Sequence, residues 1–208
     1  MTLLVLTNVQ RVRDLMSASE ALPANASLDT VIGRLVQGVS AEVERYLDRG
    51  LNLEARTEQF SPKRFQRTVH LQAYPVAASP AAVVKIASNR DFAAATATAT
   101  TDYFLDAPRG LVKFDDPLDE GNGTVQVVYT GGLATQAAND AHLPGLEAAY
   151  PDIVLGATLW AKVLYDARHR VGASSKGVKG TFIATAGIGH PPPEVKQLLE
   201  SHRRLRLG

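Results

Sequence analysis

The sequence predicts an α+β protein in which a small antiparallel β domain is inserted into a helical core. Apolar residues recur at three- and four-residue steps near 28–49 and 151–170, the pattern of two long helices. Between them, short apolar stretches alternate with turn residues, which is typical of strands in an antiparallel sheet or barrel. Residues 171–193 hold five glycines and end in three prolines, which indicates an extended arm. We therefore expect a helical core domain of 1–51 and 132–171, a β domain of 52–131, and a flexible arm of 172–208 that ends in a short helix.

The long helix near 28–49 has recognisable ends and two internal glycines. Ser27 or Asp29 can cap its start, and Gly50 suits the left-handed position after its end. Gly33 and Gly38 lie inside it, and each costs roughly 1 kcal/mol relative to alanine. Close approach of another helix would offset that cost, so we expect a tight helix crossing at these glycines.

The other helices differ in how much of their surface is apolar. A short helix is expected over 8–17, followed by a loop over 18–27. The helix near 151–170 starts at Pro151 and is apolar on both flanks, so it should be covered on more than one side. The stretch 133–151 is expected to be a loop. Because neither long helix can bury its apolar face alone, the two should pack together.

Five or six strands are expected in the β domain, joined by short turns. The segment 106–110 has the composition of a hairpin turn. The Ala/Thr tract 93–101 fits either a flexible loop or an edge strand. The expected strands are 52–60, 65–73, 83–88, 103–105, 111–114 and 123–129.

Composition excludes several classes of protein. The 208 residues include no cysteine, which excludes disulfide scaffolds, thiolate zinc sites and cysteine nucleophiles. No apolar run approaches the ~20 residues that span a bilayer, so we expect a soluble chain with no membrane partner. The net charge of +1 provides no overall attraction to nucleic acid.

The sequence offers no convincing catalytic, cofactor or metal site. None of the five histidines stands at metal-ligand spacing from another. Gly172–Gly177 has the glycine spacing of a phosphate loop but lacks the Lys-Ser/Thr that should follow. The pairs Asp115-Asp116 and Asp119-Glu120 are expected in a turn and could bind a divalent cation, although solvated acids are the commoner interpretation. We expect a protein that is not an enzyme.

Charge is unevenly distributed along the chain. Residues 159–208 hold nine Lys or Arg and three Asp or Glu, a balance of +6, so the rest of the chain carries −5. This segment is either a solvated tail or one that attracts an acidic partner or another copy.

The final helix, expected over about 194–206, combines that basic charge with an apolar stripe. Its leucines and Val195 recur at helical spacing and need a surface on which to pack. We expect this arm to bind a partner protein or a neighbouring subunit through Val195, Lys196, Leu198, Leu199, Arg203, Arg204, Leu205 and Arg206.

Four segments, taken in order, resemble a known family. They are Leu28–Gly50, Thr57–Phe60 with His70–Val76, Val125–Gly132, and Leu159–Gly172 continued by Pro193–Glu200 and the basic end. In the order and spacing of these segments, the chain resembles the head–tail connector proteins of tailed bacteriophages, also called adaptor or head-completion proteins.

The resemblance implies a structural virion protein at the head–tail interface, made in the cytoplasm of the bacterial host. Such proteins form a ring, commonly twelve-fold, under the portal protein; the ring extends the DNA channel and meets the next neck or tail protein. DNA would pass without sequence-specific binding, no cofactor would be needed, and 193–206 would grip the portal. Two alternatives stay open: another phage neck or tail-terminator ring protein, and a nucleic-acid-binding module that uses the basic C-terminus.

Overall fold

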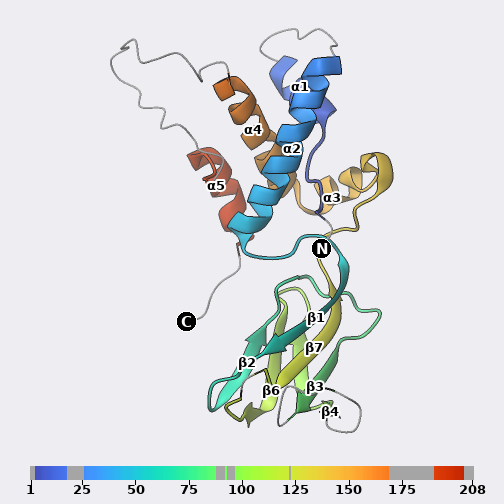
Figure 1. Ribbon diagram of the computed structural model, residues 1–208, viewed down its shortest axis with the longest axis vertical. Coiled ribbons are helices and arrows are strands. Elements are labelled where there is room, and N and C mark those ends of the chain that lie inside the picture. Colours follow the sequence, from blue (N-terminus) through green and yellow to red (C-terminus); the bar gives the residue numbers. More distant parts are fainter. Residues whose placement is uncertain are drawn as a thin grey trace, which may run out of the picture. The chain divides into compact units, whose positions relative to one another are not determined.

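The computed structural model describes residues 3–17, 26–87, 92, 97–121, 123–168 and 190–203. Within these residues it contains five α-helices, one 3-10 helix and seven strands, which confirms an α+β fold (Figure 1). The chain forms two compact units. The helical unit is made of Met1–Asp48 and Gln136–Gly208, and the β unit is Arg49–Thr135.

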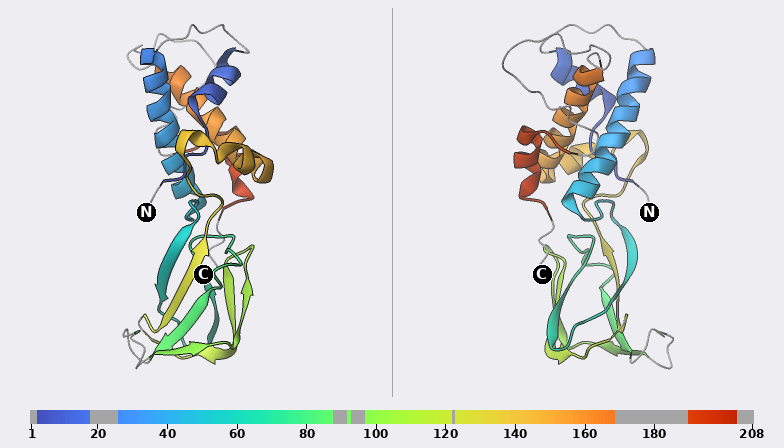
Figure 2. Two further views of the ribbon diagram at one scale, coloured as in Figure 1. Left: turned by 90° about the vertical axis from the view of Figure 1, so that its right-hand side faces the viewer. Right: turned by 60° about the vertical axis from the view of Figure 1, so that its left-hand side comes forward.

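The helical unit is organised around one helix, α4, which contacts α1, α2, α3 and α5 (Figure 2). This confirms that α4 is covered on more than one side and that the two long helices pack together. None of the helices in the described residues is long and apolar enough to cross a bilayer. The elements are α1 (Val9–Ser17), α2 (Ala26–Leu47), η1 (Ala138–Asp140), α3 (Leu143–Ala149), α4 (Pro151–Arg168) and α5 (Pro193–Glu200).

The core of the helical unit combines apolar side chains with a few paired polar groups. The hydroxyls of Thr7 and Thr158 lie 2.8 Å apart in the core, and Leu6 N donates to Ser40 Oγ at 3.1 Å. These bonds satisfy polar groups that would be costly to bury alone. The apolar core residues are Leu4, Leu6, Val12, Met16, Ile32, Val36, Val39, Val43, Leu47, Leu143, Leu146, Ile153, Val154, Ala157, Trp160, Ala161, Tyr165, Val195 and Leu199.

The close approach of another helix that was expected at the two glycines of α2 is not found there. A Cβ on Gly38 would meet nothing within 4 Å, and one on Gly33 would make an ordinary contact with Val9 at 3.8 Å. The closely packed glycine is Gly156 on α4, where a Cβ would lie 3.3 Å from Leu199 Cδ2. The prediction at Gly38 was wrong because helical position alone does not show which glycine faces another helix.

The end of α2 also differs from the sequence prediction. The helix stops at Leu47, and Asp48 has the positive φ of 54° that was expected at Gly50. Aspartate tolerates this left-handed conformation better than most residues. A Cβ at Gly50 would lie 2.5 Å from an Arg56 guanidinium nitrogen, so a side chain there would displace the end of Arg56.

The stretch 133–151, expected to be a loop, contains η1 and α3. Pro144 lies in the first turn of α3, where no helical hydrogen bond needs its missing N–H. His142 precedes this helix, and its Nε2 lies 2.7 Å from Val5 O. The prediction of a loop over 133–151 was wrong because Pro144 begins a helix there.

The β unit consists of two antiparallel sheets that share one core. The first has strand order β1-β7-β3-β4, and the second has order β2-β6-β5. The shared core is Val69, Leu71, Ala73, Val76, Val84, Val112, Phe114, Leu118, Val125, Val127 and Tyr129. The strands are β1 (Glu54–Phe60), β2 (Gln66–His70), β3 (Val83–Ala87), β4 (Ala97–Thr100), β5 (Tyr103–Asp106), β6 (Leu111–Leu118) and β7 (Val125–Gly131).

Two expectations for the β region are confirmed. Residues 97–100 form β4, an edge strand that pairs with β3, while 93–96 lie outside the described residues. The β5–β6 hairpin turns at the predicted 106–110, where Gly110 has a φ of 62° and Arg109 N donates to Asp106 O. The strand count is higher than the expected five or six, because the tract 93–101 contributes a strand.

Candidate interaction site

Helix α5 lies against α4 within the helical unit (Figure 1). Pro193 opens the helix without losing a hydrogen bond, and Glu194 complements the positive helix end. Val195 and Leu199, four residues apart, lie on one face and are 1% and 0% exposed. Leu199 meets α4 at Gly156, where the lack of a side chain admits it.

Polar contacts hold the C-terminal end of α5 to α2. The Tyr46 hydroxyl donates to Glu200 Oε2 at 2.5 Å, and the Arg203 guanidinium lies 5.5 Å from the centre of the Tyr46 ring. Partial burial, and then the hydrogen bond to Glu200, raises the pKa of Tyr46 to about 12. The same hydrogen bond is the main reason why the pKa of Glu200 is lowered, with Arg203 adding to the effect.

His202 provides a second contact beyond the end of α5. Its ring meets Tyr150 edge-to-face with 6.2 Å between centroids, and its Nε2 lies 3.7 Å from Asp152 Oδ2. The start of the basic end, as far as Arg203, is therefore attached to the helical unit.

The predicted interaction residues fall into three groups. Val195 and Leu199 pack inside the helical unit, and Leu198 is half-buried beside them. Lys196 and Arg203 are exposed and available to a partner. The remaining predicted residues, Arg204, Leu205 and Arg206, lie outside the described residues.

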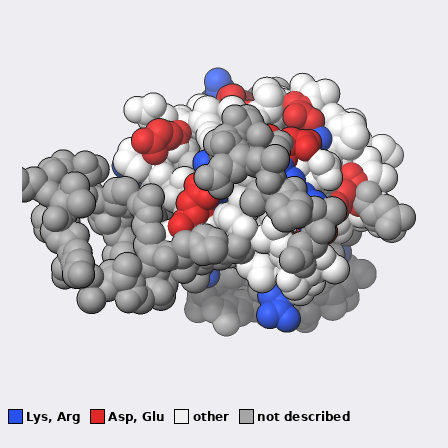
Figure 3. Space-filling model, turned by 90° about the horizontal axis from the view of Figure 1, so that it is seen from above, with Lys and Arg blue, Asp and Glu red and all other residues white. Residues whose placement is uncertain are grey.

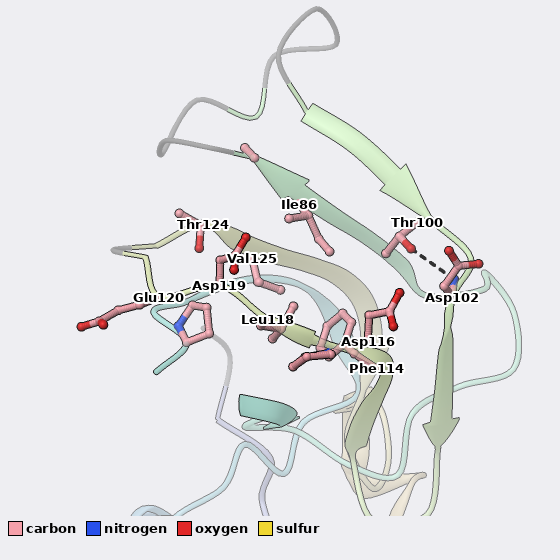
Figure 4. Close-up of a pocket in the computed structure, with 13 residues that line it drawn as sticks. Ile86, Thr100, Asp102, Phe114, Asp116, Leu118, Asp119, Glu120, Thr124 and Val125 are labelled. Carbon is pink, nitrogen blue, oxygen red and sulfur yellow. Dashed lines mark hydrogen bonds between the residues drawn. The ribbon is translucent and has the colours of Figure 1, made fainter. Parts of the chain in front are cut away.

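The β unit contains a pocket of about 700 Å³ between the ends of several strands (Figure 4). Its apolar lining comes from Ile86 on β3, Phe114 and Leu118 on β6, and Val125 on β7. The polar lining includes four carboxylates, and none of the thirteen lining residues is Lys or Arg.

The four carboxylates belong to Asp102, Asp116, Asp119 and Glu120, and all four residues are exposed. No Lys or Arg in the described part of the chain forms an ion pair with any of them. The Asp102 carboxylate accepts a hydrogen bond from Thr101 Oγ1 at 3.4 Å, and the backbone N–H of Asp102 donates to Thr100 Oγ1 at 3.1 Å. The rim is therefore a negative surface above an apolar base.

The acid pairs singled out in the sequence include Asp116, Asp119 and Glu120, but the sequence predicted neither the part of Asp102 nor the pocket. The sequence prediction placed Asp115-Asp116 in a turn, whereas both lie in β6, which continues to Leu118. Strand alternation separates the neighbouring carboxylates: Asp116 lines the pocket and Asp115 does not. The alternation of buried Phe114 and Leu118 was a usable signal for the longer strand, but nothing in the sequence shows that three strand ends meet here.

No metal-binding cluster is found among the described residues. No group of three or more His, Asp or Glu residues there could hold a metal ion. His169 and the segment Gly172–Gly177 lie outside the described residues. On the described part of the face in Figure 3, acidic and basic side chains are interspersed and no broad positive patch is visible.

The fold has counterparts among solved structures. One is a chain in the neck of an empty gene transfer agent (GTA) particle, computed with C6 symmetry. The chain shares the fold of that neck structure. The TM-score is 0.57 and the identity 16%, over 96% of this chain and 90% of that chain.

Two further structures give the same result. They are the virion of a native GTA particle, with a TM-score of 0.53, and the neck of a native GTA particle computed with C12 symmetry, with a TM-score of 0.51. Both are 16% identical and cover 96% of this chain and 90% of theirs. No family model and no curated protein matches the sequence.

Proposed function

We propose that this protein is a structural component of the neck of a phage-like particle, at the junction of head and tail. The observation that carries the proposal is the fold, which is shared over 96% of the chain with chains of GTA neck and virion structures. The four ordered segments that resemble head–tail connector proteins support the same function from the sequence.

The more specific role is that of a connector that forms a ring beneath the portal, extends the DNA channel and joins the capsid to the tail. Ring subunits contact their neighbours through two different surfaces, and such heterologous contacts close when the rotation permits. A twelve-fold ring is proposed because this number is common in the resembling family. One of the neck structures that share the fold was computed with C12 symmetry.

The portal contact is proposed on the exposed side of α5 and at Arg203, which follows it. Lys196 and Arg203 are exposed there. Val195 and Leu199 would act indirectly, because their packing on α4 holds the helix in place. An acidic surface on the portal would complement this basic one.

The test is to mix the purified chain with the portal protein encoded near it and to image the mixture by negative stain. We expect an added ring at one end of the portal, and the image gives its symmetry by direct count. A chain that stays monomeric and unbound would contradict the connector role and direct the next test to tail components.

A pair of charge-reversal variants tests the surface of α5. We expect Lys196→Glu with Arg203→Glu to abolish portal binding while circular dichroism shows an unchanged fold. The matched control is Arg34→Glu with Lys63→Glu, which reverses two exposed charges elsewhere. Equal binding by the two double variants would contradict the role given to α5.

A further inference from the structure

We infer that the pocket of the β unit is a binding site for the basic segment Arg204–Leu207 of a second copy of this chain. The inference rests on the proposed function, because a ring gives each copy a neighbour. It adds a subunit–subunit contact to the portal contact proposed for α5.

The pocket has the chemistry to hold a segment that is both apolar and basic. At its base the half-buried Ile86 and the exposed Pro117 offer contact to aliphatic side chains, beside the buried Phe114, Leu118 and Val125 (Figure 4). Its rim holds four exposed carboxylates with no ion pair to a described Lys or Arg. A ligand that places apolar groups on the base and cations at the rim would complement both parts.

The chain itself contains such a segment. Arg204-Leu205-Arg206-Leu207 alternates basic and apolar residues. In an extended conformation successive side chains point to opposite sides, so both leucines could face the base of the pocket. The long arginine side chains could then bend toward the rim, where guanidinium groups bind carboxylates well.

The charge distribution along the chain supports an occupant from the same protein. Residues 159–208 carry +6 and the rest of the chain carries −5, so copies attract one another when the basic segment of one meets the acidic part of the next. The rim is an exposed acidic site within that negative part. Complementary charge of this kind mainly sets the orientation and rate of association.

The first test measures binding of a fluorescent peptide of residues 201–208 to the full chain by anisotropy. We expect saturable binding that weakens as salt is raised, because exposed charges are screened. A second peptide, with Leu205→Ser and Leu207→Ser, keeps the charge and should bind at least about fivefold more weakly, because it loses the burial of two apolar side chains. Equal binding of the two peptides would show a purely ionic attraction and overturn the assigned site.

Two neighbouring residues provide a matched pair of variants. Asp116 lines the pocket and Asp115, also exposed, does not. Asp116→Asn should weaken peptide binding about two- to fivefold, the range of an exposed ion pair, whereas Asp115→Asn should have no effect. Adding Asp119→Asn and Glu120→Gln to Asp116→Asn should bring the loss to about tenfold or more. No loss in this triple variant would overturn the proposal.

A truncated chain and engineered cysteines distinguish a second copy from the same copy. If the segment occupied the pocket of its own chain, the peptide would bind only to a variant that ends at Arg203; we expect it to bind the full chain as well. Because the chain has no cysteine, Thr124→Cys with Leu205→Cys introduces a single pair. Oxidation should produce covalent oligomers on a non-reducing gel, and a cross-linked monomer alone would overturn the role of the second copy.

These results separate the site from the proposed function. Peptide binding needs neither the portal nor a ring, so a chain that binds the peptide but no portal would keep the pocket assignment and contradict the connector role. A chain that forms a ring on the portal but binds no peptide would support the connector role and contradict the pocket assignment. Thr57→Cys with Leu205→Cys is the cross-linking control, since Thr57 is exposed on β1 and does not line the pocket.

Discussion

The helical unit takes its core from both ends of the chain, whereas the β unit takes its core from one continuous segment. In the helical unit, the hydroxyls of Thr7 and Thr158 meet across 151 positions of sequence. The β unit closes its two sheets within Arg49–Thr135. The helical unit therefore exists only when the two chain ends have come together, while the β unit has all its partners nearby in sequence.

The two units also differ in how they hold their polar groups. The helical core pairs small hydroxyls, as at Thr7 and Thr158. The β unit uses the buried Tyr129, whose hydroxyl donates to Glu58 and accepts from Ala73 N at 3.0 Å. Burial, and then the hydrogen bond to Glu58, raises the pKa of Tyr129. One tyrosine thus joins β1, β7 and the chain after β2.

The largest expected effect tests whether the two units unfold separately. Trp160 is fully buried in the helical unit, and Trp160→Ala should lower its free energy of unfolding by about 3–5 kcal/mol. Far-UV circular dichroism should show helix loss at lower urea, while NMR signals of the β unit stay dispersed. Val163→Ala, on an exposed part of the same helix, is the control. Unfolding of both units at the same urea concentration would contradict their separate stability.

A glycine in the β unit provides the reciprocal test. Gly132 has a φ of 138°, and a Cβ there would lie 2.4 Å from the backbone carbon of Asn52. Gly132→Ala should destabilise the β unit by about 2 kcal/mol or more, because both the backbone angle and the space disfavour a side chain. Urea unfolding followed by NMR should show this loss in the β unit, with the helical unit unchanged. Gly145→Ala, which has open space in α3, should show no such loss.

A smaller effect of opposite sign is expected on α2. Gly38 lies in the helix with nothing within 4 Å of its Cβ position, so Gly38→Ala should stabilise the helical unit by about 0.5–1 kcal/mol. Thermal unfolding measures the gain. Gly156→Ala should gain less, since its Cβ would lie 3.3 Å from Leu199. An equal gain at both positions would show that α5 does not pack closely on α4.

The smallest effect concerns the contact between α2 and α5. The pKa of Glu200 is lowered, so this contact contributes stability above the usual glutamate pKa and loses it as pH falls through the lowered value. Tyr46→Phe removes the main cause, and an NMR titration should show the pKa of Glu200 moving up toward its ordinary value. An unchanged Glu200 titration would contradict the hydrogen bond.

At high pH the same contact loses stability as pH rises, whereas at low pH it loses stability as pH falls. The pKa of Tyr46 is raised from 10.0 to about 12, so its contribution is complete below pH 10 and is lost as pH rises through about 12. Tyr46→Phe should remove this loss.

Sequence patterns were most informative where burial is local. The spacing of apolar residues in α2 and α4 predicted both helices to within two residues at each end, because buried residues recur at helical spacing along most of each helix. The hairpin between β5 and β6 was equally clear, since a turn depends on a few adjacent residues. Patterns failed at α3, where Pro144 opens a helix, and at Gly38, which meets no other helix.

By itself the sequence determined the α+β class, the periodic faces of the long helices, the uneven charge and the absence of cysteine chemistry. Only the tertiary structure decided that α5 covers Gly156 of α4 and that Asp116, but not Asp115, lines an acidic pocket with Phe114 and Val125. The physical reason is the sequence separation between the residues that pack together. Periodicity records which side of an element is buried, but the element that covers it is chosen by packing between residues far apart in the chain, which no local pattern encodes.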